Sequence, residues 1–263
     1  MDTTKTEIST LWALAEELAD AARRETLRHF RRRDLAAESK DAGFDPVTVA
    51  DRASEEAMRG LLAKARPEDG ILGEEFGPKD SASGLTWVLD PIDGTRSYIC
   101  GTPTWGVLVA LSDADGPKLG LIDQPYTGER FMGGAGRACV TGPLGTQDLK
   151  TRATTHLEDA KLFTTFPEVG TPEEGAAFRR VADKVRLTRY GCDCYAYALL
   201  AAGQIDLVIE AGLQAYDIQA PIAVIQAAGG IVTDWSGKPA HNGGRALAAA
   251  TPELHAAALE LLA

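Results

Sequence analysis

A pair of aspartates stands directly after a short apolar run near the middle of the first half. Residues 87–89 are Trp-Val-Leu, and Asp90 and Asp93 follow them, with Gly94 and Thr95 next. Carboxylates gathered at the end of a strand are hard oxygen ligands of the kind Mg²⁺ prefers, and the ion keeps waters for a substrate. Asp, Pro and Gly are also turn residues, so a plain strand-to-turn transition is the structural alternative.

The spacing of these two acids bears on how a phosphate ester could be cleaved. Haloacid-dehalogenase-type phosphatases use an aspartate nucleophile and a second acid two residues later, whereas here Asp93 is three residues after Asp90 and Pro91 lies between them. The aspartyl-nucleophile chemistry therefore loses its main support. The pattern favours metal-assisted attack by water, in which ions lower the pKa of a bound water and neutralise charge on the leaving oxygen.

Three further stretches of the chain carry acidic candidates for the same chemistry. Glu74 and Glu75 follow a short apolar run, Asp51 begins a segment with helical periodicity, and Asp217 precedes another, with Pro221 in its first turn. Each has a structural alternative. The two glutamates are equally compatible with a solvated acidic turn, and each aspartate stands where a helix N-cap is expected.

Taken together and in order, five pieces of the chain resemble the inositol monophosphatase-like family of Mg²⁺-dependent, Li⁺-sensitive phosphatases. The resemblance covers most of the chain. It implies a layered α-β-α-β-α sandwich of the inositol monophosphatase and fructose-bisphosphatase type, a small phosphomonoester substrate and a homodimer. The pieces are Lys40 with residues 45–51 (DPVTVAD), residues 73–75 (GEE), residues 90–95 (DPIDGT), residues 191–210, and Tyr216-Asp217 followed by Ala220.

The resemblance implies two or three Mg²⁺ ions per site. Glu74, Asp90 and the carbonyl of Ile92 are then ligands of the first ion. Asp90, Asp93 and Asp217 hold the second, and Glu74 helps to place a third ion that carries the attacking water. The chemistry agrees with this assignment, because two ions sharing a bridging carboxylate stabilise both ends of a transferring phosphoryl group, and Asp90 is the natural bridge.

The same resemblance implies roles around the attacking water. Thr95 and Asp51 look like the pair that orients or deprotonates this water. The amides of Gly94 and Thr95, which open a short helix, then hold the phosphate. Lys40 matches a lysine on a mobile loop near the site in the family, although a lone lysine is also an ordinary surface residue.

Substrate choice is expected to depend on acids in the second half of the chain. Glu210 ends the strand expected at 205–209, seven residues before Asp217, and Asp193 opens an expected helix. Carboxylates in a partly dry pocket suit a substrate with positive charge, because they make charge-assisted hydrogen bonds to an amine or imidazolium. The alternatives are a surface acid for Glu210 and a helix N-cap for Asp193.

Two segments, residues 193–197 (DCYAY) and residues 122–125 (IDQP) through Glu129-Arg130, resemble the histidinol-phosphate phosphatase branch more than the inositol branch. The sequence also departs from the inositol pattern at residues 96–98 and at Asp193. We therefore expect hydrolysis of L-histidinol phosphate, a step of histidine biosynthesis. Inositol or another polyol phosphate is the alternative within the class, and a bisphosphate is disfavoured because no second basic cluster lies near the motifs. Two alternatives of other classes are a non-catalytic metal or anion binder and a redox role for Cys192 and Cys194.

The elements that must position these residues differ between the two halves. A first helix is expected over 9–33, capped by Ser9 or Thr10, with an arginine-rich end that we interpret as a solvated face. A second helix is expected from Asp51 to Pro67. Strand-like runs at 86–89, 106–111, 119–123 and 130–132, separated by turn residues, indicate an antiparallel sheet.

After residue 140 the pattern changes to α/β. Strands are expected at 161–165, 185–189, 205–210 and 231–233, with helices starting at 171, 193, 217 and 251, which indicates a parallel or mixed sheet. The fold class is therefore α/β, in two subdomains over 1–140 and 141–263 that share a core. The first subdomain carries most metal ligands, and the second carries the specificity residues and the last ligand.

Composition excludes several classes of protein. Hydrophobic residues make up 44% and charged residues 25% of the 263, as in ordinary globular chains. The formal net charge is −11, which repels nucleic-acid phosphates. No apolar run approaches the length of a membrane span and no leader pattern is present, so the cytoplasm is expected. Four cysteines are too few for a disulfide framework, and we expect mostly buried thiols.

Overall fold

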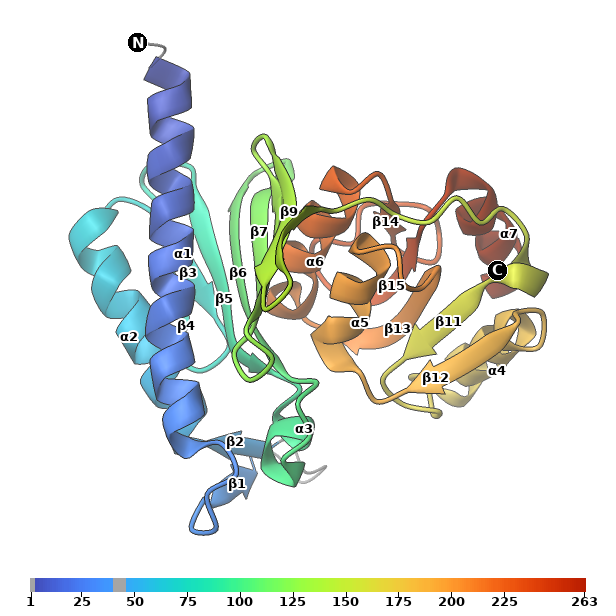
Figure 1. Ribbon diagram of the computed structural model, residues 1–263, viewed down its shortest axis with the longest axis horizontal. Helices are drawn as coiled ribbons and strands as arrows, with labels where there is room; N and C mark the ends of the chain where they lie inside the picture. Colours follow the sequence, from blue (N-terminus) through green and yellow to red (C-terminus); the bar gives the residue numbers. More distant parts are fainter. Residues whose placement is uncertain (1–2, 40–45) are drawn as a thin grey trace.

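The computed structural model describes residues 3–39 and 46–263, so the predicted site residue Lys40 lies outside the described residues. Two sheets, one of eight strands and one of five, alternate with layers of helices (Figure 1). Helices cover the outer face of each sheet, and a further helical layer separates the sheets. The layered α-β-α-β-α arrangement predicted from the family resemblance is therefore confirmed.

The larger sheet lies in the first half of the chain and contains the predicted strands. Its neighbours are antiparallel, except for a parallel pair formed by residues 70–73 and 86–89. The sheet continues past residue 140, because the last hairpin turns at residues 143–144. Its strands are β3 (Gly70–Gly73), β4 (Gly77–Lys79), β5 (Thr86–Asp93), β6 (Gly106–Asp113), β7 (Gly116–Gln124), β8 (Glu129–Gly134), β9 (Arg137–Gly142) and β10 (Gly145–Asp148), in the order β10-β9-β8-β7-β6-β5-β3-β4.

Two helices, α1 (Thr3–His29) and α2 (Val49–Ala65), pack on the outer face of this sheet. The prediction of a cap at Ser9 or Thr10 is wrong, because α1 begins at Thr3 and both hydroxyls donate to the carbonyl of Thr6 inside the helix. The helix also ends before residue 33. Helix α2 has Thr48 as its N-cap.

The arginine-rich end of α1 is only partly the solvated face that we expected. Arg23 donates through Nε and Nη2 to the carboxylate of Asp123, at 2.9 and 2.6 Å, and Asp123 is fully buried. Arg130 donates to the same carboxylate at 2.7 Å. This cluster ties α1 to β7 and β8, because a buried carboxylate needs its charged partners. The other arginines of the group, at 24, 28, 31, 32 and 33, are exposed.

The smaller sheet is mixed, as the α/β pattern of the second half predicts. Residues 161–164 pair in parallel with both of their neighbours, and the remaining pairs are antiparallel. The strand over 244–249 was not predicted, since its Ala-rich sequence has no alternation. The strands are β11 (Lys161–Thr164), β12 (Leu187–Tyr190), β13 (Leu207–Leu213), β14 (Ile231–Thr233) and β15 (Gly244–Ala249), in the order β12-β11-β13-β15-β14.

Helices α5 (Asp193–Ala201) and α6 (Ala215–Ala227) fill the space between the two sheets. Helix α6 approaches the larger sheet closely at two glycines. A Cβ on Gly120 would lie 2.4 Å from the carbonyl oxygen of Ala220, and one on Gly133 would lie 2.3 Å from Cα of Val224. These glycines let the helix bury its small side chains directly on β7 and β8. Helices α4 (Pro172–Ala182) and α7 (Pro252–Leu262) cover the far face of the smaller sheet.

Smaller elements complete the described part of the chain. A two-stranded sheet of β1 (Ala37–Ser39) and β2 (Pro46–Thr48) lies near the short helix α3 (Thr95–Cys100), and a 3₁₀ turn covers Leu157–Asp159. Among the described residues no helix combines the length and the apolar character that crossing a bilayer requires. All four cysteines are free, but the expectation of mostly buried thiols is wrong, because only Cys194 is fully buried.

Candidate active site

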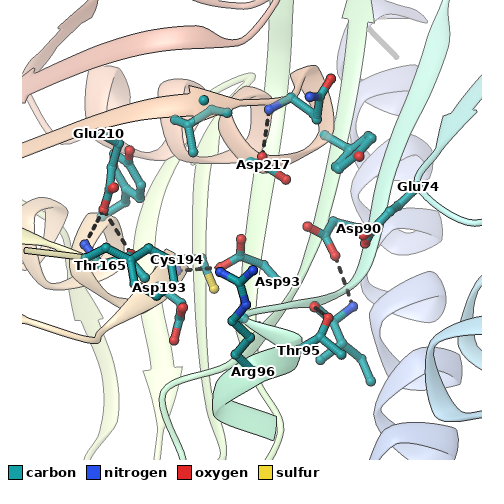
Figure 2. A pocket seen from close by; sticks show the side chains of 18 of the residues that line it. Glu74, Asp90, Asp93, Thr95, Arg96, Thr165, Asp193, Cys194, Glu210 and Asp217 are labelled. Atoms are coloured by element: carbon teal, nitrogen blue, oxygen red, sulfur yellow. Dashed lines mark hydrogen bonds between the residues drawn. The ribbon is translucent and has the colours of Figure 1, made fainter. Parts of the chain in front are cut away.

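A cavity of about 430 Å³ lies where the two halves of the chain meet. Its wall combines the end of β5, the start of α3, the first turns of α5 and α6, and the end of β13. Figure 2 shows Glu74 and Asp90 on one side, Thr165, Asp193 and Glu210 on the other, and Asp93 and Asp217 between them.

The end of β5 is irregular, and this irregularity positions two of the acids. Asp90 pairs with Leu108 and Asp93 with Gly106, so the β5–β6 register shifts between the two aspartates. Asp90 is 1% exposed, and one of its oxygens accepts the amide of Ile92 at 3.0 Å. With this shift in register, both carboxylates reach the cavity.

Asp217 completes a cluster of three carboxylates. It lies in the first turn of α6, and Gln214 occupies the N-cap position that the alternative gave to Asp217. Asp217 still takes part in the cap from the third helical position, because its carboxylate accepts the amide of Gln214 at 2.7 Å. The same side chain faces the acids of β5 across the cavity (Figure 2). One oxygen from each of Asp90, Asp93 and Asp217 lies within 4.8 Å of the others. Capping and a role in the cluster are compatible, because a carboxylate accepts several hydrogen bonds.

Glu74 adds a fourth acid beside Asp90. It follows β3, and its amide donates to the carbonyl of Leu89 on β5 at 3.3 Å. Burial, and then the negative charges of Glu74, Asp93 and Asp217, raise the pKa of Asp90 well above its ordinary value. Carboxylates that oppose one another's ionisation in a buried site are stabilised by a cation among them, and their hard oxygens fit a divalent ion such as Mg²⁺.

Thr95 and Asp51 meet below this cluster. The Thr95 hydroxyl lies 3.4 Å from Oδ1 of Asp51 and 3.1 Å from the carbonyl oxygen of Ile92, so it can donate to either. The other oxygen of Asp51 accepts the amide and hydroxyl of Thr48, at 2.8 and 2.6 Å, in the capping box of α2. Burial raises the pKa of Asp51 to about 6.

Gly94 opens α3 in a left-handed conformation, with φ at 84°. A Cβ at this position would lie 2.6 Å from Cγ of Asp193, so the glycine is required by both its φ and its neighbour. The amides of Gly94 and Thr95 stand at the start of the helix beside the cavity, where backbone N–H groups are available to an anion.

Asp193 belongs to α5, yet its carboxylate is held by the other half of the chain. Ser97 donates to it at 2.5 Å and Thr104 at 3.3 Å. The predicted N-cap alternative is wrong, because Asp193 is the first helical residue and Cys192 occupies the cap position. Its φ of 46° is left-handed, an unusual conformation that turns the side chain toward Gly94.

Glu210 lines the cavity from β13 and is 7% exposed, so it is not the surface acid of our alternative. One oxygen accepts the amide and hydroxyl of Thr165, at 2.7 and 2.9 Å, and the other accepts the hydroxyl of Thr164 at 3.2 Å. Burial outweighs these hydrogen bonds and raises the pKa of Glu210 to about 7. The carboxylate is therefore poised to ionise near neutral pH.

Comparison with known proteins agrees with this geometry. The model of the inositol monophosphatase family matches residues 7–263. The chain belongs to this family. It is 45% identical to the bifunctional phosphatase IMPL2, chloroplastic, of Arabidopsis thaliana, over 89% of the chain and 66% of that protein.

Two further members of the family are similar to this chain over nearly their whole length. A histidinol-phosphatase of Streptomyces coelicolor is 37% identical, with 92% of each chain covered. An inositol monophosphatase from Zymomonas mobilis has a solved structure that superimposes with a TM-score of 0.84 at 36% identity, covering 100% of this chain and 99% of that one. The chain is accordingly a phosphoric monoester hydrolase of the inositol monophosphatase family.

One residue that supports the family site was missed by sequence reasoning. Glu55 has a fully buried side chain that accepts the amides of Glu75 and Phe76, at 2.7 and 3.3 Å, and pairs with Arg59 at 2.7 Å. It thereby fixes the turn that presents Glu74. The only signal was an acid four residues before an arginine, which is typical of an exposed helical pair.

The two cysteines at the start of α5 do not have the environment of redox thiols. Burial raises the pKa of both Cys192 and Cys194, and the charge of Asp93 raises that of Cys194 further. Reactive cysteines need the opposite shift, because the thiolate is the nucleophile. The amide of Cys194 donates to Asp93 at 2.5 Å, so this segment contributes through its backbone.

Proposed function

We propose that this chain is a Mg²⁺-dependent phosphatase whose substrate is L-histidinol phosphate. The observation that carries the substrate assignment is the pair of carboxylates of Glu210, which is buried, and Asp193, which is half-buried, on the cavity wall opposite Glu74 and Asp90. Histidinol phosphate carries an ammonium group and an imidazole, and each can make a charge-assisted hydrogen bond to a carboxylate. The name of the Streptomyces coelicolor relative supports the same substrate.

In this proposal Glu74, Asp90, Asp93, Asp217 and the carbonyl of Ile92 hold two or three Mg²⁺ ions. The ions supply Lewis-acid stabilisation of the phosphoryl group and lower the pKa of the attacking water. Asp90 would be the ligand shared between ions, because it lies between Glu74 and the other two aspartates (Figure 2).

The remaining roles follow from the neighbouring groups. A water beside Thr95 gives a proton to its hydroxyl as that hydroxyl gives its own proton to Oδ1 of Asp51. A pKa near 6 suits Asp51 to this task at neutral pH, since it is ionised and still basic. The amides of Gly94 and Thr95 bind phosphate oxygens, while the water oxygen bonds to phosphorus and the bond to the leaving oxygen breaks. The leaving oxygen takes a proton from solvent water and departs as the alcohol, and Asp51 later returns its proton to solvent. Lys40 stays a prediction from the sequence.

Inositol 1-phosphate is the second candidate, because the Zymomonas mobilis relative is an inositol monophosphatase. The test is phosphate release from histidinol phosphate and inositol 1-phosphate side by side, with and without Mg²⁺. We expect Mg²⁺-dependent release and a higher kcat/KM for histidinol phosphate. We also expect Glu210→Gln to lower kcat/KM for histidinol phosphate about tenfold, with little change for the neutral ester. A preference for inositol 1-phosphate, or equal losses on both esters, contradicts the assignment.

A homodimer and a cytoplasmic location, both expected from the sequence, stay predictions. The non-catalytic alternative fits the site less well than catalysis does, because a protein that only binds a metal or an anion has no use for Thr95 paired with Asp51.

A further inference from the structure

The hydroxyl of Tyr197 is a buried polar group without a hydrogen-bond partner in the part of the chain that the structure describes. Tyr197 is 3% exposed and lies on α5, one turn after Asp193. Buried hydroxyls are normally paired, because an unpaired one forfeits its hydrogen bonds to water. When an unpaired buried hydroxyl belongs to a residue that lines a binding cavity, a bound ligand is the natural candidate for the missing partner.

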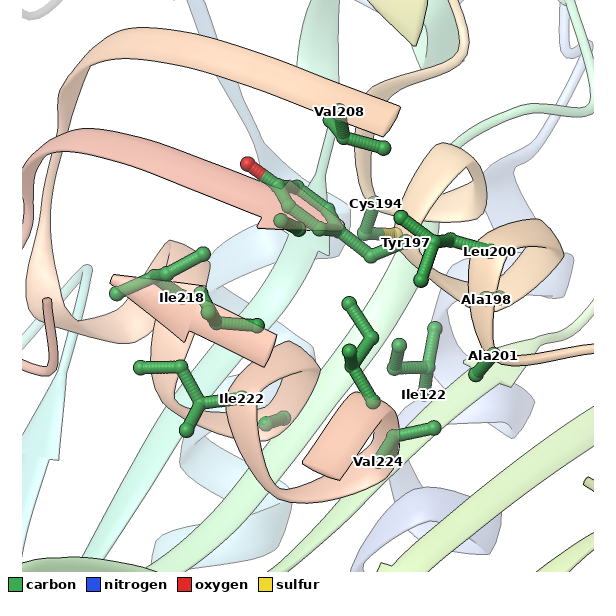
Figure 3. Packing of buried hydrophobic residues seen from close by; sticks show 14 of the residues in the cluster. Ile122, Cys194, Tyr197, Ala198, Leu200, Ala201, Val208, Ile218, Ile222 and Val224 are labelled. Atoms are coloured by element: carbon green, nitrogen blue, oxygen red, sulfur yellow. The ribbon is translucent and has the colours of Figure 1, made fainter. Parts of the chain in front are cut away.

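The ring of Tyr197 is held firmly, so its hydroxyl has a fixed position. It packs in the buried cluster between the two sheets together with Val208 and Ile218. Figure 3 shows the hydroxyl at the end of the ring directed away from Leu200 and Ala201. The packing therefore leaves little freedom for the hydroxyl to find another partner by a rotamer change.

The surroundings of this hydroxyl are those of the active site. Tyr197 lines the same cavity as Glu210, Asp93 and Asp217. Burial, and then the negative charges of these three acids, raise the pKa of Tyr197 well above its ordinary value, so the phenol stays neutral. A neutral phenol offers one proton to donate and an oxygen that accepts.

We infer that Tyr197 is a specificity-determining residue whose hydroxyl hydrogen-bonds a nitrogen or hydroxyl group on the leaving alcohol of the substrate. The phosphate has its own partners at Gly94 and Thr95, so the side of the cavity near Glu210 is left for the rest of the ester. In the case of histidinol phosphate, which rests on the proposed function, an N–H of the substrate donates to the phenol oxygen. Glu210 then supplies the negative charge that attracts the substrate's cationic group, and the hydrogen bond to Tyr197 fixes how the substrate is oriented.

The same helix provides a matched control. Tyr195 lies two residues earlier on α5, and its hydroxyl donates to Oε2 of Glu129 at 2.7 Å, away from the cavity lining. The two tyrosines thus differ in whether the hydroxyl has a hydrogen-bond partner and in whether the residue lines the cavity. One hydroxyl is paired and belongs to a residue outside the cavity lining, whereas the other has no partner among the described residues and belongs to a residue that lines the cavity.

The experiment compares Tyr197→Phe and Tyr195→Phe on two esters, histidinol phosphate and phenyl phosphate, which has no polar group beyond the ester. We expect Tyr197→Phe to lower kcat/KM for histidinol phosphate about tenfold, mainly through KM, because one hydrogen bond is lost. For phenyl phosphate the change stays below about twofold, and Tyr195→Phe stays below about twofold on both esters. In the absence of substrate, Tyr197→Phe melts at or above the wild-type temperature, since no hydrogen bond is removed.

Three results would overturn the inference. Equal losses on both esters mean that the hydroxyl serves the common phosphate chemistry, and unchanged kinetics on both mean that water satisfies it. A lower melting temperature without substrate means that the hydroxyl is paired in the free protein. Failure of the proposed function is distinguishable, because wild-type enzyme then does not prefer histidinol phosphate. The same comparison is then made with inositol 1-phosphate against phenyl phosphate.

Discussion

The two walls of the cavity hold their acids in different ways. On the wall built by β5, Asp90 and Asp93 lie close to Asp217 and to one another, and each opposes the ionisation of its neighbours. On the wall built by α5 and β13, Asp193 and Glu210 each accept hydrogen bonds from two hydroxyl groups. A cation among its acids stabilises the first arrangement, whereas the acids of the second have hydroxyl donors of their own and oxygens left to accept from an organic group.

The walls are also joined by a reciprocal exchange of hydrogen bonds. Asp93 of the first half accepts the amide of Cys194, and Asp193 of the second half accepts the hydroxyl of Ser97. Each half thus orients an acid of the other. We therefore expect substitutions on the first wall to lower activity equally on every ester. Substitutions on the second wall should lower activity on some esters more than on others.

The largest effect is expected for Asp93→Asn on the first wall. The amide keeps an acceptor for Cys194 but removes a negative charge that a divalent ion needs. We expect kcat to fall by about 10²- to 10³-fold on histidinol phosphate and inositol 1-phosphate alike, since metal ions supply several kcal/mol of transition-state stabilisation. Steady-state phosphate release with saturating Mg²⁺ measures this, and circular dichroism shows whether the fold is kept. Near-normal turnover would remove Asp93 from the ligand set.

Thr95→Ala is expected to reduce activity somewhat less than Asp93→Asn does, and again by the same factor on both esters. It removes the hydroxyl between the water and Asp51, and positioned proton acceptors contribute about 10²-fold or more. Thr95→Ser is the matched control, because it keeps the hydroxyl and should retain most of the turnover. A Ser variant as inactive as the Ala variant would mean that the methyl group, and hence packing, is what matters at this position.

The difference between the walls also explains what could be predicted from the sequence. Asp90, Asp93, Gly94 and Thr95 are adjacent in the chain, so a local pattern of residue types was enough to predict that they act together. The partners of Asp193 are about ninety residues earlier, at Ser97 and Thr104, and only the folded chain brings them together.

Several elements were missed for related physical reasons. Strand β15 has no polar–apolar alternation to reveal it, because Ala residues lie on both of its faces. Strand β10 is a short polar run after a tight turn at residues 143–144 between two glycines. Helix α1 begins six residues before the expected start, since its polar first turns carry no apolar stripe. Buried supports such as Glu55 and Tyr197 look like a surface acid and an ordinary core aromatic, and burial is set by the tertiary fold.

The next largest effect is expected in how kcat/KM depends on pH through Glu210 on the second wall. The pKa of Glu210 is raised to about 7, so its charged fraction rises from about one tenth at pH 6 to about nine tenths at pH 8. We expect the ratio of kcat/KM between wild type and Glu210→Gln, on histidinol phosphate, to rise about tenfold over this range and then level off. Using the ratio cancels the titration of the phosphate group and of Asp51, which act alike in both enzymes. The same ratio on inositol 1-phosphate should be flat, and a parallel rise there would show that Glu210 acts on the shared chemistry.

The smallest effect is expected at a helix cap whose residues are not part of the cavity lining, and it tests whether stability alone can alter the choice of ester. Thr171 caps α4 by accepting the amide of Glu174 at 3.2 Å, while the carboxylate of Glu174 accepts the amide of Thr171 at 2.8 Å. Thr171→Ala should cost about 1 kcal/mol of unfolding free energy. Thermal unfolding should show a midpoint about 2–4 °C lower. The relative kcat/KM of histidinol phosphate and inositol 1-phosphate should stay as in wild type, because the packing of α5 and β13 around the cavity is untouched. A changed ratio would mean that selectivity follows the stability of the whole second half, and the contrast between the two walls would then lose its chemical basis.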